Sequence, residues 1–275
     1  MTQANVRGGI GEAAAAAVAG GSVLEARGLR KQFGGLTAVA DFSVSLRKNE
    51  IVGVIGPNGA GKTTVFNLLT GVYVPDSGTI ELDGVDLKQL PPHRVTASGV
   101  ARTFQNIRLF KDMSVLENVK VGFEVRRKAR LLSAVFRQQS FHKEEAMIER
   151  EARELLNLLG LAEQADNRSR NLPYGQQRKL EIARALATGP KVLLLDEPAA
   201  GMNESESAAL RELLLKIRER FQLSILLIEH DMPFVMGLVS RLIVLDHGSI
   251  IAEGTPEEIR KNPAVIEAYL GKEEP

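Results

Sequence analysis

The residues best suited to chemistry form a glycine-rich loop that follows the apolar run 51–55. The loop consists of Gly56, Pro57, Asn58, Gly59, Ala60, Gly61, Lys62, Thr63 and Thr64. Glycines let successive backbone amides turn inward around phosphate oxygens, Lys62 supplies a cation for the β- and γ-phosphates, and the Thr63 hydroxyl can ligate Mg²⁺. Because a helix-compatible segment, 65–69, follows at once, we predict that this loop binds a nucleoside triphosphate.

Two adjacent carboxylates, Asp196 and Glu197, follow the apolar run 192–195. Such runs are typical of strands buried on both faces of a parallel sheet, and open α/β sheets bind ligands at the carboxyl ends of those strands. Asp196 is suited to hold Mg²⁺ through its water shell, and Glu197 to orient the water that attacks a γ-phosphate. The alternative is that both only stabilise the N-terminus of the next helix. The phosphate loop favours the catalytic interpretation.

His230 comes shortly after a second continuous apolar run, 225–228, and is therefore expected at the same edge of the sheet. From there its imidazole can donate a hydrogen bond to a γ-phosphate oxygen. Gln105 precedes a helical region. Its amide is not diagnostic by itself, and on its own chemistry it is interpreted as a surface residue.

A further anion site is predicted at the start of a helix. The segment comprises Leu172, Pro173, Tyr174, Gly175 and Gln176. Gly175 marks the helix start, and apolar residues at 180, 183 and 186 carry the helix toward a core. Exposed amides and the positive end of the helix dipole make such a terminus attractive to anions.

The periodicity of apolar residues indicates which elements position these side chains. Strand patterns occupy 23–26, 41–46, 51–55 and 78–82. Helical periodicity extends over 109–161, where one apolar stripe contains Ile148, Ala152, Leu155 and Leu159. Strand patterns resume at 192–195, so we predict a helical subdomain inserted into a largely parallel sheet. A hairpin over 242–252 and helices starting near Thr255 and Pro263 complete the pattern.

The composition excludes several functions. The chain has 275 residues, 44% of them hydrophobic, which is enough to bury a full core as one large domain or as two closely joined lobes. A net charge of +1 provides no basic footprint, so nucleic acid is not an expected partner. Without cysteine there is no disulfide or thiolate metal site. No apolar run approaches the ~20 residues of a membrane-spanning helix, so we expect any membrane association to be peripheral.

Five motifs, in this order and spacing, resemble the ATP-binding-cassette (ABC) ATPases: the phosphate loop, Gln105, LPYGQ as a degenerate LSGGQ signature, the VLLLDE run and His230. The resemblance covers nearly everything from Val23 onward. It implies an α/β fold of the P-loop NTPase class, with a mainly parallel core sheet, an antiparallel β subdomain and an inserted helical subdomain. The cassette would occupy 23–272, with the helical subdomain at approximately 107–187 and flexible tails at 1–22 and 273–275.

The resemblance also implies a role for each candidate residue, with ATP and Mg²⁺ as cofactors. The catalytic residues would be Glu197, His230, Lys62 and Gln105, and the metal ligands Thr63, Gln105 and Asp196. Phe33 matches the aromatic residue that stacks on adenine, a core phenylalanine being the alternative. In this family two subunits sandwich two ATP molecules, so the phosphate loop of one subunit faces the signature segment, 172–176, of the other.

Several segments look more narrowly like the ATPase subunits of branched-chain amino-acid importers: 31–39, 172–186, 197–203 and 265–271. This implies an ATP-hydrolysing subunit bound peripherally at the cytoplasmic face of the cell (inner) membrane. Its expected partners are a second ABC ATPase subunit and transmembrane permease subunits, with an extracytoplasmic solute-binding protein acting indirectly. Gln105 and the helical subdomain would pass the ATP-driven motion to the permeases.

Two alternatives stay open at this point. One is the ATPase of another ABC transporter, for amide or urea uptake or for lipid export. The other is a soluble ABC nucleotide switch. Soluble members generally join two cassettes in one chain or carry long coiled-coil or zinc insertions, whereas this chain has one cassette and no cysteine.

Pro173 and Asn203 are among the positions that depart from the family pattern. Pro173 stands where the signature serine would donate a hydrogen bond to the opposite γ-phosphate, a bond worth about 1.5–3 kcal/mol. Gly175, its neighbouring amides and the helix dipole remain, so we predict a weakened site and favour a heterodimer with a subunit whose signature is intact. Asn203 replaces the usual aspartate of the loop that contacts the partner subunit.

A basic stretch, 126–130, precedes apolar residues at 131, 132, 135 and 136. Such a basic amphipathic segment can contact lipid headgroups or a membrane subunit. The alternative is a solvated charged face, which is common on helices.

Overall fold

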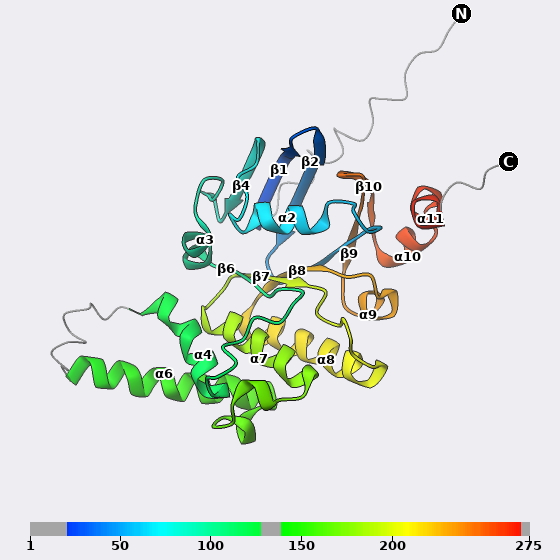
Figure 1. Cartoon of the computed structure of the whole chain (residues 1–275). Helices are drawn as coiled ribbons and strands as arrows, with labels where there is room; N and C mark the ends of the chain where they lie inside the picture. Colours follow the sequence, from blue (N-terminus) through cyan, green and yellow to red (C-terminus); the bar gives the residue numbers. More distant parts are fainter. Residues whose placement is uncertain (1–20, 128–138, 271–275) are drawn as a thin grey trace, which may run out of the picture.

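The computed structural model describes residues 21–127 and 139–270 (Figure 1). Within these ranges the strands form one sheet in the order β5-β4-β1-β2-β10-β9-β3-β8-β7-β6. The strands on the antiparallel side are β1 (Ser22–Phe33), β2 (Leu36–Arg47), β4 (Ser77–Leu82) and β5 (Val85–Asp86). The remaining strands are β3 (Ile51–Ile55), β6 (Val100–Arg102), β7 (Val192–Asp196), β8 (Ser224–Ile228), β9 (Arg241–Asp246) and β10 (Ser249–Gly254).

The core of the sheet is parallel, because β3 pairs in parallel with β8 and β9, and β7 with β8 and β6. The fold predicted from the sequence is therefore confirmed: a mainly parallel core sheet joined to an antiparallel layer. The two parts meet where β10 pairs with β2 through Ser249 and Asp41. The hairpin predicted over 242–252 is also present, as the antiparallel pair β9 and β10.

The strands of the parallel core are buried on both faces. In β3, Val52 and Val54 belong to a hydrophobic cluster shared with α2 (Lys62–Leu69) and the antiparallel strands. Ile51 and Ile55 point to the opposite face and belong to the cluster shared with the larger helices. This arrangement explains why the core strands are continuous apolar runs rather than alternating ones.

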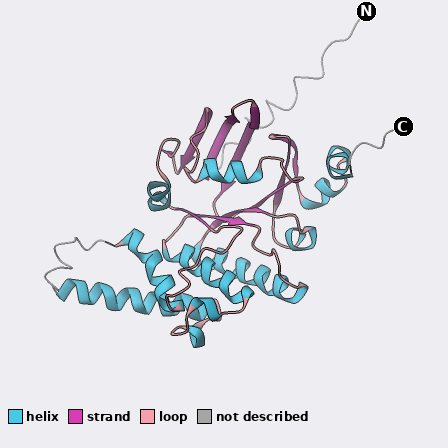
Figure 2. Cartoon of the chain, in the orientation of Figure 1, coloured by secondary structure: helices cyan, strands magenta, loops and turns pink. Residues whose placement is uncertain are grey.

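The helices gather mainly on one side of the sheet, with the antiparallel strands at the other end of the molecule (Figure 2). Besides α2, the helices are α3 (Pro92–Ser98), α4 (Val115–Phe123), α6 (Gln139–Leu158), α7 (Tyr174–Ala187), α8 (Glu204–Phe221), α9 (Met232–Met236), α10 (Pro256–Arg260) and α11 (Pro263–Leu270). Short 3-10 turns occur at η1 (Glu124–Arg126), η2 (Ala162–Gln164) and η3 (Ser169–Asn171).

Helices α4, α6 and α7 lie together, apart from the antiparallel strands (Figure 1), and fall within the range predicted for the helical subdomain. The predicted apolar stripe is buried: Ile148, Ala152 and Leu155 lie on α6, and Leu159 follows its last residue directly. Helix α4 approaches α7 closely at Gly122, where a Cβ atom would lie 2.4 Å from the carbonyl oxygen of Arg184. Glycine is required there because no side chain fits between the two backbones.

The helix near the C-terminus starts as the sequence predicts. Thr255 is the N-cap of α10, its side chain accepts a hydrogen bond from the Glu258 amide, and Pro256 occupies the first turn. A capping box of this kind satisfies two amides that a helix leaves unpaired. Helix α11 begins at Pro263, also as predicted.

The described part of the basic stretch 126–130 is tied to α6. Arg127 forms ion pairs with Glu124 at 2.7 Å and with Glu145 at 3.1 Å, and Arg126 lies 3.7 Å from Glu151. Residues 128–138, including the apolar positions of that segment, lie outside the described residues, as do 1–20 of the predicted tail and all of 271–275. Among the helices that the structure describes, none is both long and apolar enough to cross a bilayer.

Candidate nucleotide site

The glycine-rich loop connects β3 to α2, as predicted. Helix α2 begins at Lys62, and its N-cap, Gly61, has a φ of 102°. A Cβ atom on Gly61 would lie 2.4 Å from the carbonyl oxygen of Ala38, so glycine is required both by conformation and by space. The first amides of a helix lack acceptors within the helix, which makes the start of α2 a suitable anion site.

The Lys62 side chain folds back over the loop. Its Nζ donates hydrogen bonds to the carbonyl oxygens of Gly56 at 2.7 Å and Pro57 at 2.9 Å. Burial lowers the pKa of the Lys62 ammonium, and the carboxylates of Glu197 and Asp196 offset part of that effect. The ammonium therefore lies within the field of both carboxylates, in a loop whose amides and cation fit a bound triphosphate.

Asp196 is the last residue of β7 and is only 4% exposed. Its Oδ2 accepts a hydrogen bond of 2.8 Å from Nη2 of Arg102, and the other guanidinium nitrogen, Nη1, donates to Oδ1 of Asn67 at 2.7 Å. No pattern in the sequence predicted Arg102 at this site. Arg102 ends β6, which pairs with β7, so both Arg102 and Asp196 lie at the same edge of the sheet.

Three of the predicted catalytic residues meet at Glu197. The amide Nε2 of Gln105 donates a 2.8 Å hydrogen bond to Glu197 Oε2, and His230 Nδ1 lies 3.8 Å from Glu197 Oε1. The Glu197 amide also donates to the carbonyl of Ile228 at 2.9 Å, which fixes the chain directly after β7 against the end of β8. Glu197 has a φ of 47°, a left-handed conformation that is costly for glutamate and is typical of functional positions.

The remaining candidates lie in separate surroundings. Phe33, at the end of β1, is 41% exposed and contacts Tyr73 edge to face, with ring centroids 5.1 Å apart. Helix α7 begins at Tyr174 with Pro173 as its N-cap, so Gly175 lies inside the first turn rather than at the boundary. In the described part of the chain, no hydrogen bond or ion pair joins the 172–176 segment to the phosphate loop.

Glu229 is a functional candidate that the sequence analysis missed. It is fully buried between β8 and His230. Its Oε1 accepts a hydrogen bond from the Ala199 amide at 2.8 Å, and its Oε2 accepts one from the His230 amide at 3.1 Å. Burial raises the pKa of Glu229, and these backbone hydrogen bonds oppose the rise. Glu229 thus connects the loop after Glu197 to the segment that carries His230.

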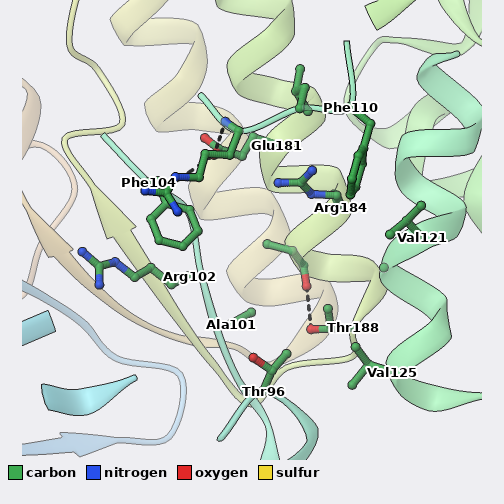
Figure 3. Close-up of a pocket in the computed structure, with 14 residues that line it drawn as sticks. Thr96, Ala101, Arg102, Phe104, Phe110, Val121, Val125, Glu181, Arg184 and Thr188 are labelled. Carbon is green, nitrogen blue, oxygen red and sulfur yellow. Dashed lines mark hydrogen bonds between the residues drawn. The ribbon is translucent and has the colours of Figure 1, made fainter. Parts of the chain in front are cut away.

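A groove of about 540 Å³ lies between β6 and the helices α4 and α7. Figure 3 shows Arg184 beside Phe110, with Val121 and Val125 on the facing helix segment. The Arg184 guanidinium lies 5.5 Å from the Phe110 ring centroid, and burial lowers its pKa. Arg108 lies 4.2 Å over the ring of Phe104. The groove is therefore apolar where Val121 and Val125 face it, and its other wall carries Arg108, Arg184 and the Glu181 carboxylate.

Comparison with known proteins identifies the class. A family model described as ABC transporter matches residues 39–200, more than half of the chain. A second model, described as branched-chain amino acid ATP-binding cassette transporter, matches residues 249–275. The chain belongs to the ABC transporter family and is an ATPase of the cassette class, as the order of its motifs predicted.

Individual relatives belong to the same family. The chain is 48% identical to the high-affinity branched-chain amino acid transport ATP-binding protein LivG of Salmonella typhimurium, over 91% of this chain and 98% of that protein. It is 46% identical to BraF of Pseudomonas aeruginosa, a protein of the same description, with the same coverage. It also resembles the solved structure of MJ1267, an ATP-binding cassette of an ABC transporter in its ADP conformation, with 32% identity, a TM-score of 0.80, and coverage of 92% and 100%.

The buried Glu229 carboxyl generates a pH prediction. Because its pKa is raised by folding, the folded protein binds that proton more tightly than the unfolded chain does. Wild-type stability should therefore fall, relative to the Glu229→Gln variant, as pH rises from the ordinary glutamate pKa of 4.5 to the raised value. Urea unfolding of both proteins between about pH 4 and about pH 8 measures this difference in unfolding free energy.

Glu258 supplies a control of opposite sign. Its pKa is lowered by hydrogen bonds from Thr255, so wild type should gain stability relative to Glu258→Gln as pH rises from that lowered value to the ordinary glutamate pKa of 4.5. The urea series for this pair therefore starts at about pH 3. If the two variants show pH dependences of the same sign, the environment inferred for Glu229 is wrong.

Proposed function

We propose that this chain powers an importer of branched-chain or closely related amino acids by hydrolysing ATP. The convergence of Gln105 and His230 on Glu197, beside the ammonium of Lys62, carries the catalytic part of this proposal. The substrate follows from the relatives named for branched-chain amino acid transport and from the second matching family model.

The proposed division of labour follows the geometry. Lys62 and the amides at the start of α2 bind the phosphates, while Thr63 and Asp196 would hold Mg²⁺. When bound, Mg²⁺ supplies charge neutralisation at the phosphate oxygens. Glu197 holds and polarises the attacking water, and Gln105, already bonded to Glu197, orients that carboxylate. The roles of Phe33 on adenine, of His230 on the γ-phosphate, and of Gln105 as a metal ligand remain predictions.

A transporter of another kind is the second candidate. The chain is 34% identical to the lipopolysaccharide export ATP-binding protein LptB of Haemophilus influenzae, over 92% of this chain. Identity to the branched-chain proteins is higher, at 46–48%, which favours import. An ATPase for amide or urea uptake would carry out closely related chemistry. The permease and the solute-binding protein would then determine which of these solutes is transported.

We also infer that the chain works as one half of a pair of cassettes. Residues 172–176 begin α7 with Pro173 at the N-cap and without a side-chain cap hydrogen bond. This segment would face the ATP bound to the partner cassette, and the partner's signature would face Lys62. Because Pro173 cannot donate a hydroxyl hydrogen bond, a different subunit with an intact signature is the favoured partner.

The groove supports docking of a permease at the cytoplasmic face of the inner membrane, with the solute-binding protein acting from the opposite side. Its apolar wall includes Val125, which is 41% exposed, and its other wall carries Arg108 and Arg184. An exposed apolar surface with adjacent cations suits a short amphipathic helix of a membrane protein that carries an acidic residue.

Glu197→Gln tests the ATPase mechanism. The variant should still bind ATP, because the phosphate loop is intact, but should hydrolyse it about 10²-fold or more slowly, because a general base is lost. It should also accumulate as a closed dimer with its partner subunit. Phosphate release, binding of a fluorescent ATP analogue and gel filtration measure these effects. Glu219→Gln, at a side chain 69% exposed at the end of α8, is the control. Wild-type rates in Glu197→Gln would remove Glu197 from this role.

Val125→Glu tests permease docking. Loss of one apolar contact and introduction of a negative charge should reduce the permease that copurifies with the tagged chain by about tenfold. ATP binding by the variant should be unchanged, since Val125 lies in η1 and not in the phosphate loop or the start of α2, where Lys62 lies. Val85→Glu on β5, where the valine is 56% exposed, is the matched control. Equal permease recovery with both variants would contradict docking at the groove.

Pro173→Ser tests the asymmetry. Restoring a hydroxyl at this position should raise ATP turnover of the assembled complex, by up to about tenfold for one charge-assisted hydrogen bond. Serine is also a good N-cap, so Pro173→Ala and thermal unfolding of both variants separate catalysis from helix stability. Turnover that does not increase with serine counts against a weakened site.

A further inference from the structure

Arg178 is the largest fully buried side chain in the described part of the molecule, and the assigned chemistry does not use it. Its Nη1 donates to the carbonyl oxygen of Phe104 at 2.6 Å and to Glu181 Oε2 at 2.9 Å. Its Nη2 donates to the carbonyl oxygen of Gln105 at 2.9 Å and to the Tyr174 hydroxyl oxygen at 3.2 Å. One guanidinium therefore joins the first turns of α7 to the main chain of Gln105.

Glu181 holds the same segment from its other side. It is 2% exposed, and its Oε1 lies 3.4 Å from the Phe104 amide nitrogen and 3.3 Å from that of Arg108. Figure 3 shows Glu181 directed at this stretch of backbone on the wall of the groove. The segment 103–110 has no helix or strand of its own, so these two side chains of α7 replace the missing regular hydrogen bonds.

Tyr174 extends the contact to a third loop. The Tyr174 ring packs on Gly201, where a Cβ atom would be 3.5 Å from the ring. Gly201 belongs to the loop that follows Glu197. Its φ of 76° and the overlying ring leave little freedom in that loop. Tyr174 stands where the family signature has glycine. It thus connects the guanidinium of Arg178 to the backbone downstream of Glu197.

We propose that Arg178 is a positioning residue for ATP hydrolysis: supported by Tyr174, it couples the start of α7 to Gln105 and thereby holds the Gln105 amide on Glu197. This proposal rests on the catalytic roles proposed above. Displacement of α7 by a partner subunit would move the Gln105 carbonyl with it, because the bonds from Arg178 are short and shielded from water.

The chemistry of arginine explains why lysine cannot replace it. A guanidinium presents several donors in a fixed plane and can bond two carbonyls, a carboxylate and a hydroxyl together. An ammonium at the same site would still neutralise Glu181 but could not span the Phe104 and Gln105 carbonyls in this geometry. Arg178→Lys therefore retains the buried ion pair, whose loss would threaten folding, while releasing Gln105.

The experiment is a kinetic double-mutant cycle on the full-length chain in its complex purified from membranes. Arg178→Lys should lower kcat for ATP hydrolysis about tenfold, the loss expected for charge-assisted hydrogen bonds, with KM for ATP changed by less than about twofold. In a Gln105→Ala background, Arg178→Lys should have no further effect on kcat, because no side chain remains to be positioned. Arg153→Lys, in an exposed pair with Glu149 on α6, is the control.

The outcomes are distinguishable. Tyr174→Phe, which removes only the supporting hydroxyl, should lower kcat by a smaller factor. Its effect on kcat should not add to that of Arg178→Lys or of Gln105→Ala in the double variants. If Arg178→Lys slows wild type and Gln105→Ala by the same factor, or raises KM instead of lowering kcat, Arg178 is only a structural residue and the proposal is overturned. Failure of the proposed function would show differently, as absence of ATP hydrolysis by the unmutated complex or as full activity of Glu197→Gln.

Discussion

The position of β8 between β3 and β7 is the constraint on which the site depends. All three strands are parallel, so they end at one edge of the sheet, and the register aligns Val54 of β3, Ile228 of β8 and Asp196 of β7 in one row. The phosphate loop, the carboxylates and His230 leave the sheet from this row. Because each strand is buried on both faces, a shift of one residue would exchange the side chains of two packed layers. The hydrophobic core therefore fixes the relative positions of the proposed catalytic residues.

The buried charges around this edge are each held by a defined partner. Asp196 is paired with Arg102, Glu181 with Arg178, and Glu229 accepts hydrogen bonds from three backbone amides. Burial of a carboxylate is costly unless such partners are present, and it raises the pKa of both Glu181 and Glu229. The same contacts tie loops to one another. Electrostatic stability and positioning of the catalytic loops therefore come from the same residues.

Most strands and the nucleotide loop were predictable because their signals are local, whereas the short strands β5 and β6 were not predicted. The run 51–55 matches β3 residue for residue, and the core runs after 190 fall inside β7 and β8, since continuous apolar segments bounded by polar residues allow few other interpretations. Arg102 and Arg178 were not predictable. Arg102 pairs with Asp196, 94 residues away in sequence, and Arg178 bonds the carbonyls of Phe104 and Gln105, 73–74 residues away. Only the sheet order and the docking of α7 bring these groups together. Glu229 carried a usable signal, a carboxylate directly after a buried strand.

The degenerate signature is better explained by what Tyr174 contacts than by what the segment lacks. A serine and a glycine at positions 173 and 174 would leave the first turn of α7 free to approach a partner's nucleotide. Tyr174 instead ties that turn to its own subunit, through Gly201 on one side and Arg178 on the other. The first turn of α7 is thus held by contacts within the chain. Motion of α7 would reach Gln105 and Glu197 of the same chain directly, through the hydrogen bonds made by Arg178 and Gln105.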